Sequence, residues 1–419
     1  MREHETVVIV GAGLAGHSAA ESLRTEGFNG KIVLFGQESQ RPYDRPPLSK
    51  EFLKGEWLEE RLYYRPESAY CEQRIDLRLN TRVDGLDTEK QLVLVSEAEP
   101  VPYDHLLLAV GGYPKRLTIP GADLAGIHYL RTLEDSAEIS KLLQPGVRLV
   151  VVGGGFIGCE VAAAVRARGV EVTLLEPLPL LMGHAFGPEV GGFYAAEHRA
   201  HGVNLRLGEG ISEFVGHTHV ESVVSAKGHT FACDSVVVGI GITPATDILK
   251  NTPVAIDNGI LVDEYCRTNV PNVYAVGDVA NWWHPTLRRR LRVEHWDHAG
   301  KQAITAIRNM LGQNEVYKPV PYVWTDQYDL HLQLFGSIPK DGKVEFVMRG
   351  SYDERRFNIF YHIDRRLVAT VSVNRLKDAR ATIKLIETGI EIDPSQLADT
   401  SVDIKELVKV SHDNRSRAS

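Results

Sequence analysis

The chain has 419 residues, of which 43% are hydrophobic and 24% charged, and its formal net charge is −8 at pH 7. This composition is ordinary for a globular enzyme, the length predicts about three domains, and the acidic balance argues against a nucleic acid partner. No run approaches the roughly 18 apolar residues of a membrane span, so no membrane partner is expected.

The cysteines and the first residues of the chain indicate a compartment. Four scattered cysteines without C-x-x-C spacing exclude a disulfide framework and favour a reducing environment. Residues 1–5 are polar and run directly into the first expected strand, which leaves no room for a signal peptide. We therefore expect a cytoplasmic protein.

The first expected element is an apolar strand, residues 6–10, that leads into Gly11, Gly13 and Gly16 and then into a helical pattern. This strand–turn–helix context is typical of dinucleotide binding. The first glycine allows the tight turn, the second lets the backbone approach a pyrophosphate, and the third lets the helix pack on the strand. The helix N-terminus would offer N–H groups to the phosphates.

The next strand, residues 31–35, is followed by Glu38, a candidate to hold the adenosine ribose. Three prolines in residues 41–50 then predict a stiff loop without a regular helix or central strand. A turn at 87–90 precedes a strand at 92–95. The buried strand that begins near Tyr103 closes on two glycines, which predicts a return to the first nucleotide.

A second fingerprint begins near Arg148, where an apolar strand leads into Gly153, Gly155 and Gly158 and an alanine-rich helix. The strand after that helix ends on Glu176, as expected for a residue that reads a ribose diol. Two complete fingerprints in one chain suggest two nucleotides held at once. FAD and NAD(P)H are the pair that passes a hydride from nicotinamide to flavin.

The remaining elements complete an α/β pattern. A buried strand runs from Ser235 into a glycine–proline crossover at 241–244, and a short strand ends at Gly277-Asp278. Beyond about residue 323, strands at 357–361 and 367–373 and a helix near 379–387 predict a small α+β domain.

With these motifs the chain resembles the oxygenase-coupled NADH–ferredoxin reductases, flavoproteins that serve Rieske dioxygenases and some P450s. The resemblance extends to about residue 400, and its most specific part is the loop Pro42–Lys50. Further matching stretches are 153–160, 277–278, 294–299 and 323–328.

The family fold implies α/β architecture, with two Rossmann-like dinucleotide-binding domains and a C-terminal α+β interface domain. The implied segments are an FAD domain at 1–113 and 243–323, an NAD domain at 114–242, an interface domain at 324–405 and a polar tail at 406–419.

The resemblance implies non-covalent FAD and NADH as cofactors, a [2Fe–2S] ferredoxin as partner and no metal site. Lys50 and Glu160 would be the catalytic residues near the hydride-accepting edge, and Arg45 would contact the flavin. Asp278 would bind the ribityl chain and Trp324 would lie close to the isoalloxazine. The other implied or predicted cofactor contacts are Gly11, Gly13, Ala15, Gly16, Gln37, Glu38, Pro46, Val83, Ala109, Gly111, Gly153, Gly155, Phe156, Ile157, Gly158, Glu176, Gly241, Gly277, Glu294, His295 and Trp296.

Four of these residues also have a structural role as the alternative to cofactor binding. Lys50 could be a surface charge, Glu160 a helix-start residue favoured by the dipole, Asp278 a turn former and Trp324 a core aromatic. Relatives usually carry an acid at Gln37, so the FAD ribose contact is open between Gln37 and Glu38.

Two other positions depart from the family pattern. Val110 replaces a family threonine, and His184 lies where many relatives have arginine. The oligomeric state is also open, with a homodimer as one alternative.

Two other functions compete with this one, and one alternative acceptor stays open. A disulfide reductase of the same architecture needs a redox-active cysteine at the flavin, and residues 42–50 contain none. A signalling flavoprotein resembling apoptosis-inducing factor would carry targeting segments and basic patches. A rubredoxin remains an alternative acceptor. The run Arg288, Arg289, Arg290 and Arg292 is a candidate docking surface for an acidic ferredoxin, or else a solvated turn.

Overall fold

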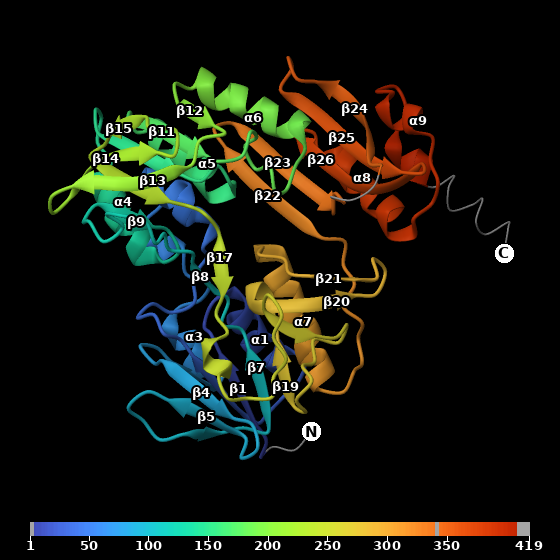
Figure 1. Ribbon diagram of the computed structural model, residues 1–419. Helices are drawn as coiled ribbons and strands as arrows, with labels where there is room; N and C mark the ends of the chain where they lie inside the picture. Colours follow the sequence, from blue (N-terminus) through green and yellow to red (C-terminus); the bar gives the residue numbers. More distant parts are fainter. Residues whose placement is uncertain (1–3, 340–342, 409–419) are drawn as a thin grey trace. The chain divides into compact units, whose positions relative to one another are not determined.

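The computed structural model describes residues 4–339 and 343–408 (Figure 1). The chain forms two compact units. Unit 1 comprises Met1–Pro46, Leu58–Tyr113 and Ile242–Pro319, and unit 2 comprises Pro47–Trp57, Pro114–Gly241 and Val320–Ser419. Residues 409–419, most of the predicted polar tail, lie outside the described residues.

Unit 1 is built on a parallel sheet of short apolar strands. They are β1 (Thr6–Val10), β2 (Lys31–Phe35), β3 (Ile75–Arg78), β7 (His105–Leu108) and β19 (Val273–Ala275). Their order is β19–β7–β1–β2–β3, and every neighbouring pair is parallel. Central strands such as β1 and β7 are almost wholly buried, which explains their continuous apolar character.

The helices of unit 1 follow these strands. They are α1 (Leu14–Thr25), α3 (Glu67–Glu72) and α7 (Trp296–Met310), with single 3-10 turns at η2 (Glu59–Arg61), η3 (Asp247–Leu249) and η4 (Gly277–Val279). Helix α1 begins at the glycine turn after β1 and packs against α7. The η4 turn follows β19, so the end of that strand also meets α7.

Three small sheets complete unit 1. One contains β4 (Val83–Asp87), β5 (Leu92–Val95) and β6 (Val101–Pro102), and another β18 (Ile260–Val262), β20 (Ala280–His284) and β21 (Arg289–Leu291). The third pairs β8 (Gly112–Pro114) with β17 (Ile242–Pro244). The chain leaves unit 1 at the end of β8 and returns at the start of β17.

Unit 2 contains the second parallel sheet. Its strands are β9 (Ile127–Tyr129), β10 (Arg148–Val152), β11 (Glu171–Glu176), β12 (Asn204–Leu207) and β16 (Ser235–Val238). Their order is β12–β11–β10–β16–β9. The associated helices are α4 (Leu133–Leu142), α5 (Phe156–Arg166) and α6 (Pro188–Ala200), and an antiparallel sheet is formed by β13 (Ile211–Gly216), β14 (Val220–Ser225) and β15 (Thr230–Ala232).

The last part of unit 2 is a five-stranded antiparallel sheet, drawn in orange and red in Figure 1. It consists of β22 (Tyr322–Gln327), β23 (Leu330–Gly336), β24 (Glu345–Ser351), β25 (Arg356–Ile363) and β26 (Arg366–Val373), in the order β22–β23–β26–β25–β24. Helices α8 (Leu376–Thr388) and α9 (Pro394–Ala398) follow it. Buried residues of both five-stranded sheets, such as Leu174 and Leu332, belong to one hydrophobic core.

The proline-rich loop after β2 divides between the units. It has no helix as far as Arg45, and then forms a 3-10 turn, η1 (Pro46–Ser49), and the short helix α2 (Glu51–Lys54). Proline is tolerated in a first helical turn because its missing N–H would have no partner there. Leu53 of α2 is fully buried in the core of unit 2, and Ser136 Oγ donates to Leu48 O at 2.7 Å.

Candidate functional site

The turn between β1 and α1 has the geometry that its glycines predict. Gly11 has φ of +109°, and a Cβ on Gly16 would lie 1.9 Å from Gly11 O, so a side chain at Gly16 would collide with the turn. Gly13 caps α1 without a side-chain hydrogen bond, and a Cβ there would meet no atom within 4 Å. A helix start that is open in this way fits an anionic group such as a pyrophosphate.

The turn between β10 and α5 in unit 2 repeats this geometry. Gly153 has φ of +104°, and a Cβ on Gly158 would lie 1.8 Å from Gly153 O. The cap residue Gly155 has φ −77° and ψ −169°, against −76° and −170° at Gly13. A Cβ on Gly155 would likewise meet nothing within 4 Å. Each unit therefore contains one turn with the shape of a pyrophosphate cradle.

The acidic residues after the second strands differ between the units. Glu176, at the end of β11, is buried and accepts hydrogen bonds from Gly154 N at 2.6 Å and Leu178 N at 2.8 Å. Its carboxylate therefore lies directly against the glycine turn. Glu38 instead accepts from Tyr43 Oη at 2.5 Å and pairs with Arg45, while Gln37 is exposed.

Near the first glycine turn, unit 1 also brings together the 277–278 motif and α7. Gly277 N donates to Gln302 Oε1 at 2.8 Å, and a Cβ on Gly277 would lie 3.4 Å from Ala15 Cβ. Gln302 is fully buried, so it fixes the turn that carries the half-buried Asp278. Gln302 was not among the residues predicted from the sequence, because no local motif marks a glutamine inside a helix.

The start of α7 is tied to the proline-rich loop. Trp296 Nε1 donates to Asp44 Oδ1 at 2.7 Å and Tyr64 Oη lies 3.2 Å away. Just before the helix, Glu294 pairs with Arg292 at 2.5 Å.

Lys50 and Glu160 lie together in unit 2, as an interacting pair and not as separate surface charges. Lys50 Nζ is 3.2 Å from Glu160 Oε2, and the two residues are 8% and 5% exposed. Ser49 Oγ donates to the same oxygen at 2.5 Å, and Thr325 Oγ1 donates to Oε1 at 2.7 Å. Glu160 thus accepts from the loop on one oxygen and from β22 on the other.

Thr325 and Ser49 were also not predicted as site residues, although both lie inside stretches that carried the family resemblance. The family resemblance implied a flavin contact for Trp324 but none for its neighbour Thr325, and a hydroxyl side chain is common anywhere in a strand. Alternation along β22 directs neighbouring side chains to opposite faces, so Trp324 and Thr325 have different surroundings.

The predicted cofactor residues are divided between the units. Unit 1 holds Gly11, Gly13, Ala15, Gly16, Gln37, Glu38, Arg45, Pro46, Val83, Ala109, Gly111, Gly277, Asp278, Glu294, His295 and Trp296. Unit 2 holds Lys50, Gly153, Gly155, Phe156, Ile157, Gly158, Glu160, Glu176, Gly241 and Trp324. Their roles as cofactor contacts stay predictions.

Metal-ligating groups, apolar helices and cysteines have the following distribution in the described part of the chain. Residues 4–339 and 343–408 contain no group of three or more His, Cys, Asp or Glu side chains that could hold a metal. Among the helices of the same ranges, none has both the length and the apolar character of a membrane span. The cysteines are free thiols, of which Cys71 is exposed and Cys159, Cys233 and Cys266 are buried.

Comparison with known proteins decides the family. Residues 5–303 match the family model described as pyridine nucleotide-disulphide oxidoreductase, and residues 322–408 match the one described as reductase C-terminal. The chain belongs to the pyridine nucleotide-disulphide oxidoreductase family.

Its relatives in that family include several ferredoxin reductases. A rhodocoxin reductase of Rhodococcus erythropolis is 38% identical over 96% of this chain and 93% of its own length. The ferredoxin–NAD(+) reductase component of the anthranilate 1,2-dioxygenase system of Burkholderia cepacia is 39% identical over 95% and 98%. Putidaredoxin reductase in its covalent complex with putidaredoxin has a TM-score of 0.94 at 34% identity, covering 98% of this chain and 100% of that one. These findings confirm the predicted fold class and the resemblance to oxygenase-coupled ferredoxin reductases.

The cysteines provide a test against disulfide chemistry, which the family description includes. Burial raises the pKa of the Cys159 and Cys266 thiols, and raises that of Cys233 to about 11. We expect a charged thiol reagent at pH 8 to label Cys71 rapidly in the native protein and the other three only after denaturation, because the thiolate is the reacting form. Peptide mapping by mass spectrometry identifies the labelled sites. Rapid NADH-dependent labelling of a second cysteine would instead indicate a redox-active thiol.

Proposed function

We propose that this chain is an FAD-dependent NADH:ferredoxin oxidoreductase that delivers single electrons to a [2Fe–2S] ferredoxin of a Rieske oxygenase or P450 system. The observation that carries the proposal is the pair of equivalent glycine turns, one in each unit, which supports two dinucleotides bound at once. The names of the relatives, ferredoxin reductase components of oxygenase systems among them, support ferredoxin as the acceptor.

The residues of each unit fit one nucleotide. In unit 1 the turn from Gly11 to Gly16 takes the FAD pyrophosphate, and Asp278 takes its ribityl chain. In unit 2 the turn from Gly153 to Gly158 takes the NADH pyrophosphate, with Glu176 at the adenosine ribose. When bound, FAD accepts a hydride from NADH and returns the electrons one at a time, so each NADH reduces two ferredoxins and releases one proton.

The protein contributes binding and electrostatics to this reaction. Lys50 provides a buried ammonium that favours negative charge on the reduced flavin, and Glu160 holds that ammonium in place. Arg45 and Trp324 are the further flavin contacts of this proposal. No general base or nucleophile is required, because the cofactor carries the bond-breaking step.

The direct test is reduction of purified [2Fe–2S] ferredoxins by NADH and this protein, followed by the bleaching of the cluster absorbance. We expect two ferredoxins reduced per NADH consumed. Rubredoxin is tested in parallel as the alternative acceptor. Oxidation of NADH that reduces small disulfides but neither iron–sulfur nor rubredoxin acceptors would contradict the proposal.

Cofactor choice depends on Glu176. Its carboxylate repels a 2′-phosphate, so NADH should exceed NADPH in kcat/KM by at least about tenfold, or about 1.4 kcal/mol. Glu176→Gln keeps an acceptor for Gly154 N but removes the charge, and should narrow that ratio by raising activity with NADPH. Glu171→Gln, an exposed acid at the start of the same strand, is the matched control. Equal activity of the unchanged protein with both nucleotides would refute this role.

The side chains of the arginine run 288–292 do not all have the same contacts. Arg290 Nη1 donates to Val262 O at 3.0 Å and Asn281 O at 2.9 Å, so its side chain fastens β21 to neighbouring backbone. Arg292 contacts Asp278 O and pairs with Glu294. Arg288 and Arg289 are both exposed, and they are the members we propose to test as a ferredoxin-docking surface.

The double variant Arg288→Gln/Arg289→Gln should raise the KM for ferredoxin and flatten its dependence on salt, because two cations that steer an acidic partner are removed. Flavin reduction by NADH without ferredoxin, measured by stopped flow, should not change. Unaltered ferredoxin kinetics at low ionic strength would assign these residues to a solvated turn.

A further inference from the structure

A series of hydrogen bonds connects Glu160 to the turn between β22 and β23, entirely within unit 2. Thr325 Oγ1 donates to Glu160 Oε1 at 2.7 Å, and Gln327 Nε2 lies 3.1 Å from Thr325 Oγ1. Gln327 Oε1 is 2.9 Å from His198 Nε2, and His198 Nδ1 is 2.8 Å from Tyr328 Oη. Thr325, Gln327 and His198 are almost fully buried.

Only one arrangement of protons satisfies every link when Glu160 is ionised and His198 is neutral. The carboxylate can only accept, so the Thr325 hydroxyl donates to it and accepts from the Gln327 amide. The Gln327 carbonyl oxygen then requires a proton on His198 Nε2, which leaves Nδ1 to accept from Tyr328. Burial lowers the pKa of His198 to about 4, which agrees with a neutral imidazole. All donors in the series therefore point toward Glu160.

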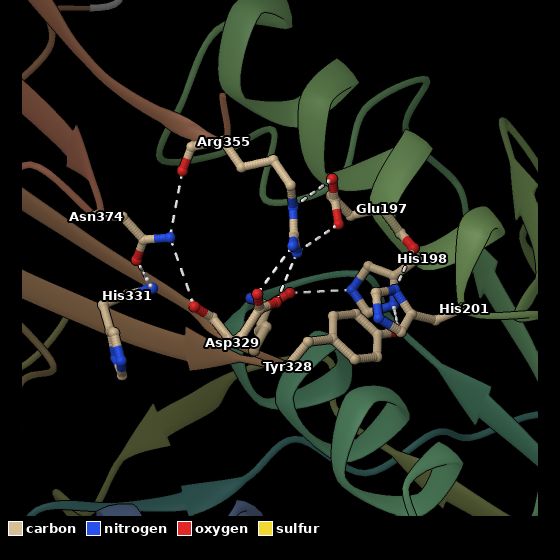
Figure 2. A network of polar contacts seen from close by, with 9 residues as sticks. Glu197, His198, His201, Tyr328, Asp329, His331, Arg355 and Asn374 are labelled. Carbon is tan, nitrogen blue, oxygen red and sulfur yellow. Dashed lines mark hydrogen bonds and ion pairs between the residues drawn. The ribbon is translucent and has the colours of Figure 1, made fainter. Parts of the chain in front are cut away.

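A second set of contacts, here called the clamp, holds the end of this series that lies at Tyr328 (Figure 2). Arg355 lies between Glu197 of α6 and Asp329 of the β22–β23 turn, with Nη2 at 2.9 Å and 2.6 Å from their carboxylate oxygens. The ring of Tyr328 stacks on His201 with centroids 3.7 Å apart. These contacts anchor the turn to α6 without using Thr325 or Gln327.

We propose that Thr325, Gln327 and His198 are positioning residues for the Lys50–Glu160 pair. Their aligned hydrogen bonds hold Oε1 of Glu160, so that Oε2 is presented to Lys50 and the ammonium keeps one location. The inference rests on the proposed function, in which Lys50 acts on the flavin. The alternative is that the series only satisfies polar groups that the fold has buried.

Substitutions at Thr325 separate the two roles. Thr325→Val keeps the volume but removes the hydroxyl, whereas Thr325→Ser keeps the hydroxyl. With holoenzyme, we expect Thr325→Val to slow flavin reduction at saturating NADH by at least about tenfold, with an unchanged Kd for NADH. Thr325→Ser should restore most of the rate. Gln327→Met should cause a smaller loss, because the Thr325 hydroxyl can still reach Glu160.

A second measurement does not depend on turnover. Amine-reactive labelling of the oxidised holoenzyme, mapped by mass spectrometry, compares Lys50 with Lys54 of α2 as an internal reference. A Lys50 side chain that is no longer held should be available to the reagent as the free amine more often, so Thr325→Val should raise the Lys50:Lys54 labelling ratio several-fold. Thr325→Ser should leave the ratio near the original value.

Arg355→Gln is the matched control, because it removes the ion pairs of the clamp but none of the atoms that hydrogen-bond in the series. It should lower the thermal midpoint without changing flavin reduction or Lys50 labelling. The inference is overturned if Thr325→Val lowers only stability, or if Arg355→Gln reproduces its kinetic effect. If the unchanged protein is not reduced by NADH at all, the proposed function fails as well. If Thr325→Val is reduced at the normal rate and its Lys50:Lys54 labelling ratio is unchanged, only the positioning role is refuted.

Discussion

The buried carboxylate of Glu160 is the constraint that joins three distant parts of unit 2, namely the proline-rich loop, α5 and β22. An ionised carboxylate removed from water requires donors close to it, and breaking such a buried pair by removing one partner costs about 3–5 kcal/mol. Here the donors come from residues 49–50 and from Thr325, which are separated by more than half of the chain. The excursion of the proline-rich loop and the C-terminal sheet are therefore both required to place one side chain of α5.

The two glycine turns have the same backbone conformation although the residues around them differ. Their cap residues have almost identical dihedral angles, yet the acids that follow the second strands have different partners. Glu176 lies against its own glycine turn, whereas Glu38 is engaged by Arg45 and Tyr43 of the proline-rich loop. The turn geometry is set by local sterics, because a Cβ on Gly16 or Gly158 would overlap backbone atoms. The choice of partner for each acid is instead set by long-range folding.

This difference explains what could be predicted from the sequence. Strands, glycine turns and the helix near residue 380 depend on local spacing and periodicity, so the fold class followed from patterns within short windows. Pairing of Lys50 with Glu160 required the family resemblance, since 110 residues separate them. Thr325, Gln302 and His198 escaped prediction because a buried hydroxyl, amide or imidazole has no sequence signature until its partner is known. Arg290 appeared to be a surface charge, and only the structure reveals its bonds to backbone oxygens.

The repeated crossing of the chain between the units has a consequence for synthesis on the ribosome. When residue 150 has been added, the ribosome has synthesised the segments that form β1, β2, β3 and β7, but not the segment that forms β19. The first parallel sheet therefore lacks an edge strand at this stage. Leu53 has emerged by then without Leu332 or Phe357, which belong to the same core. Neither unit can complete its core before the late segments appear. Nascent chains of this protein therefore carry exposed apolar surface for much of translation, the condition in which holding chaperones are most useful.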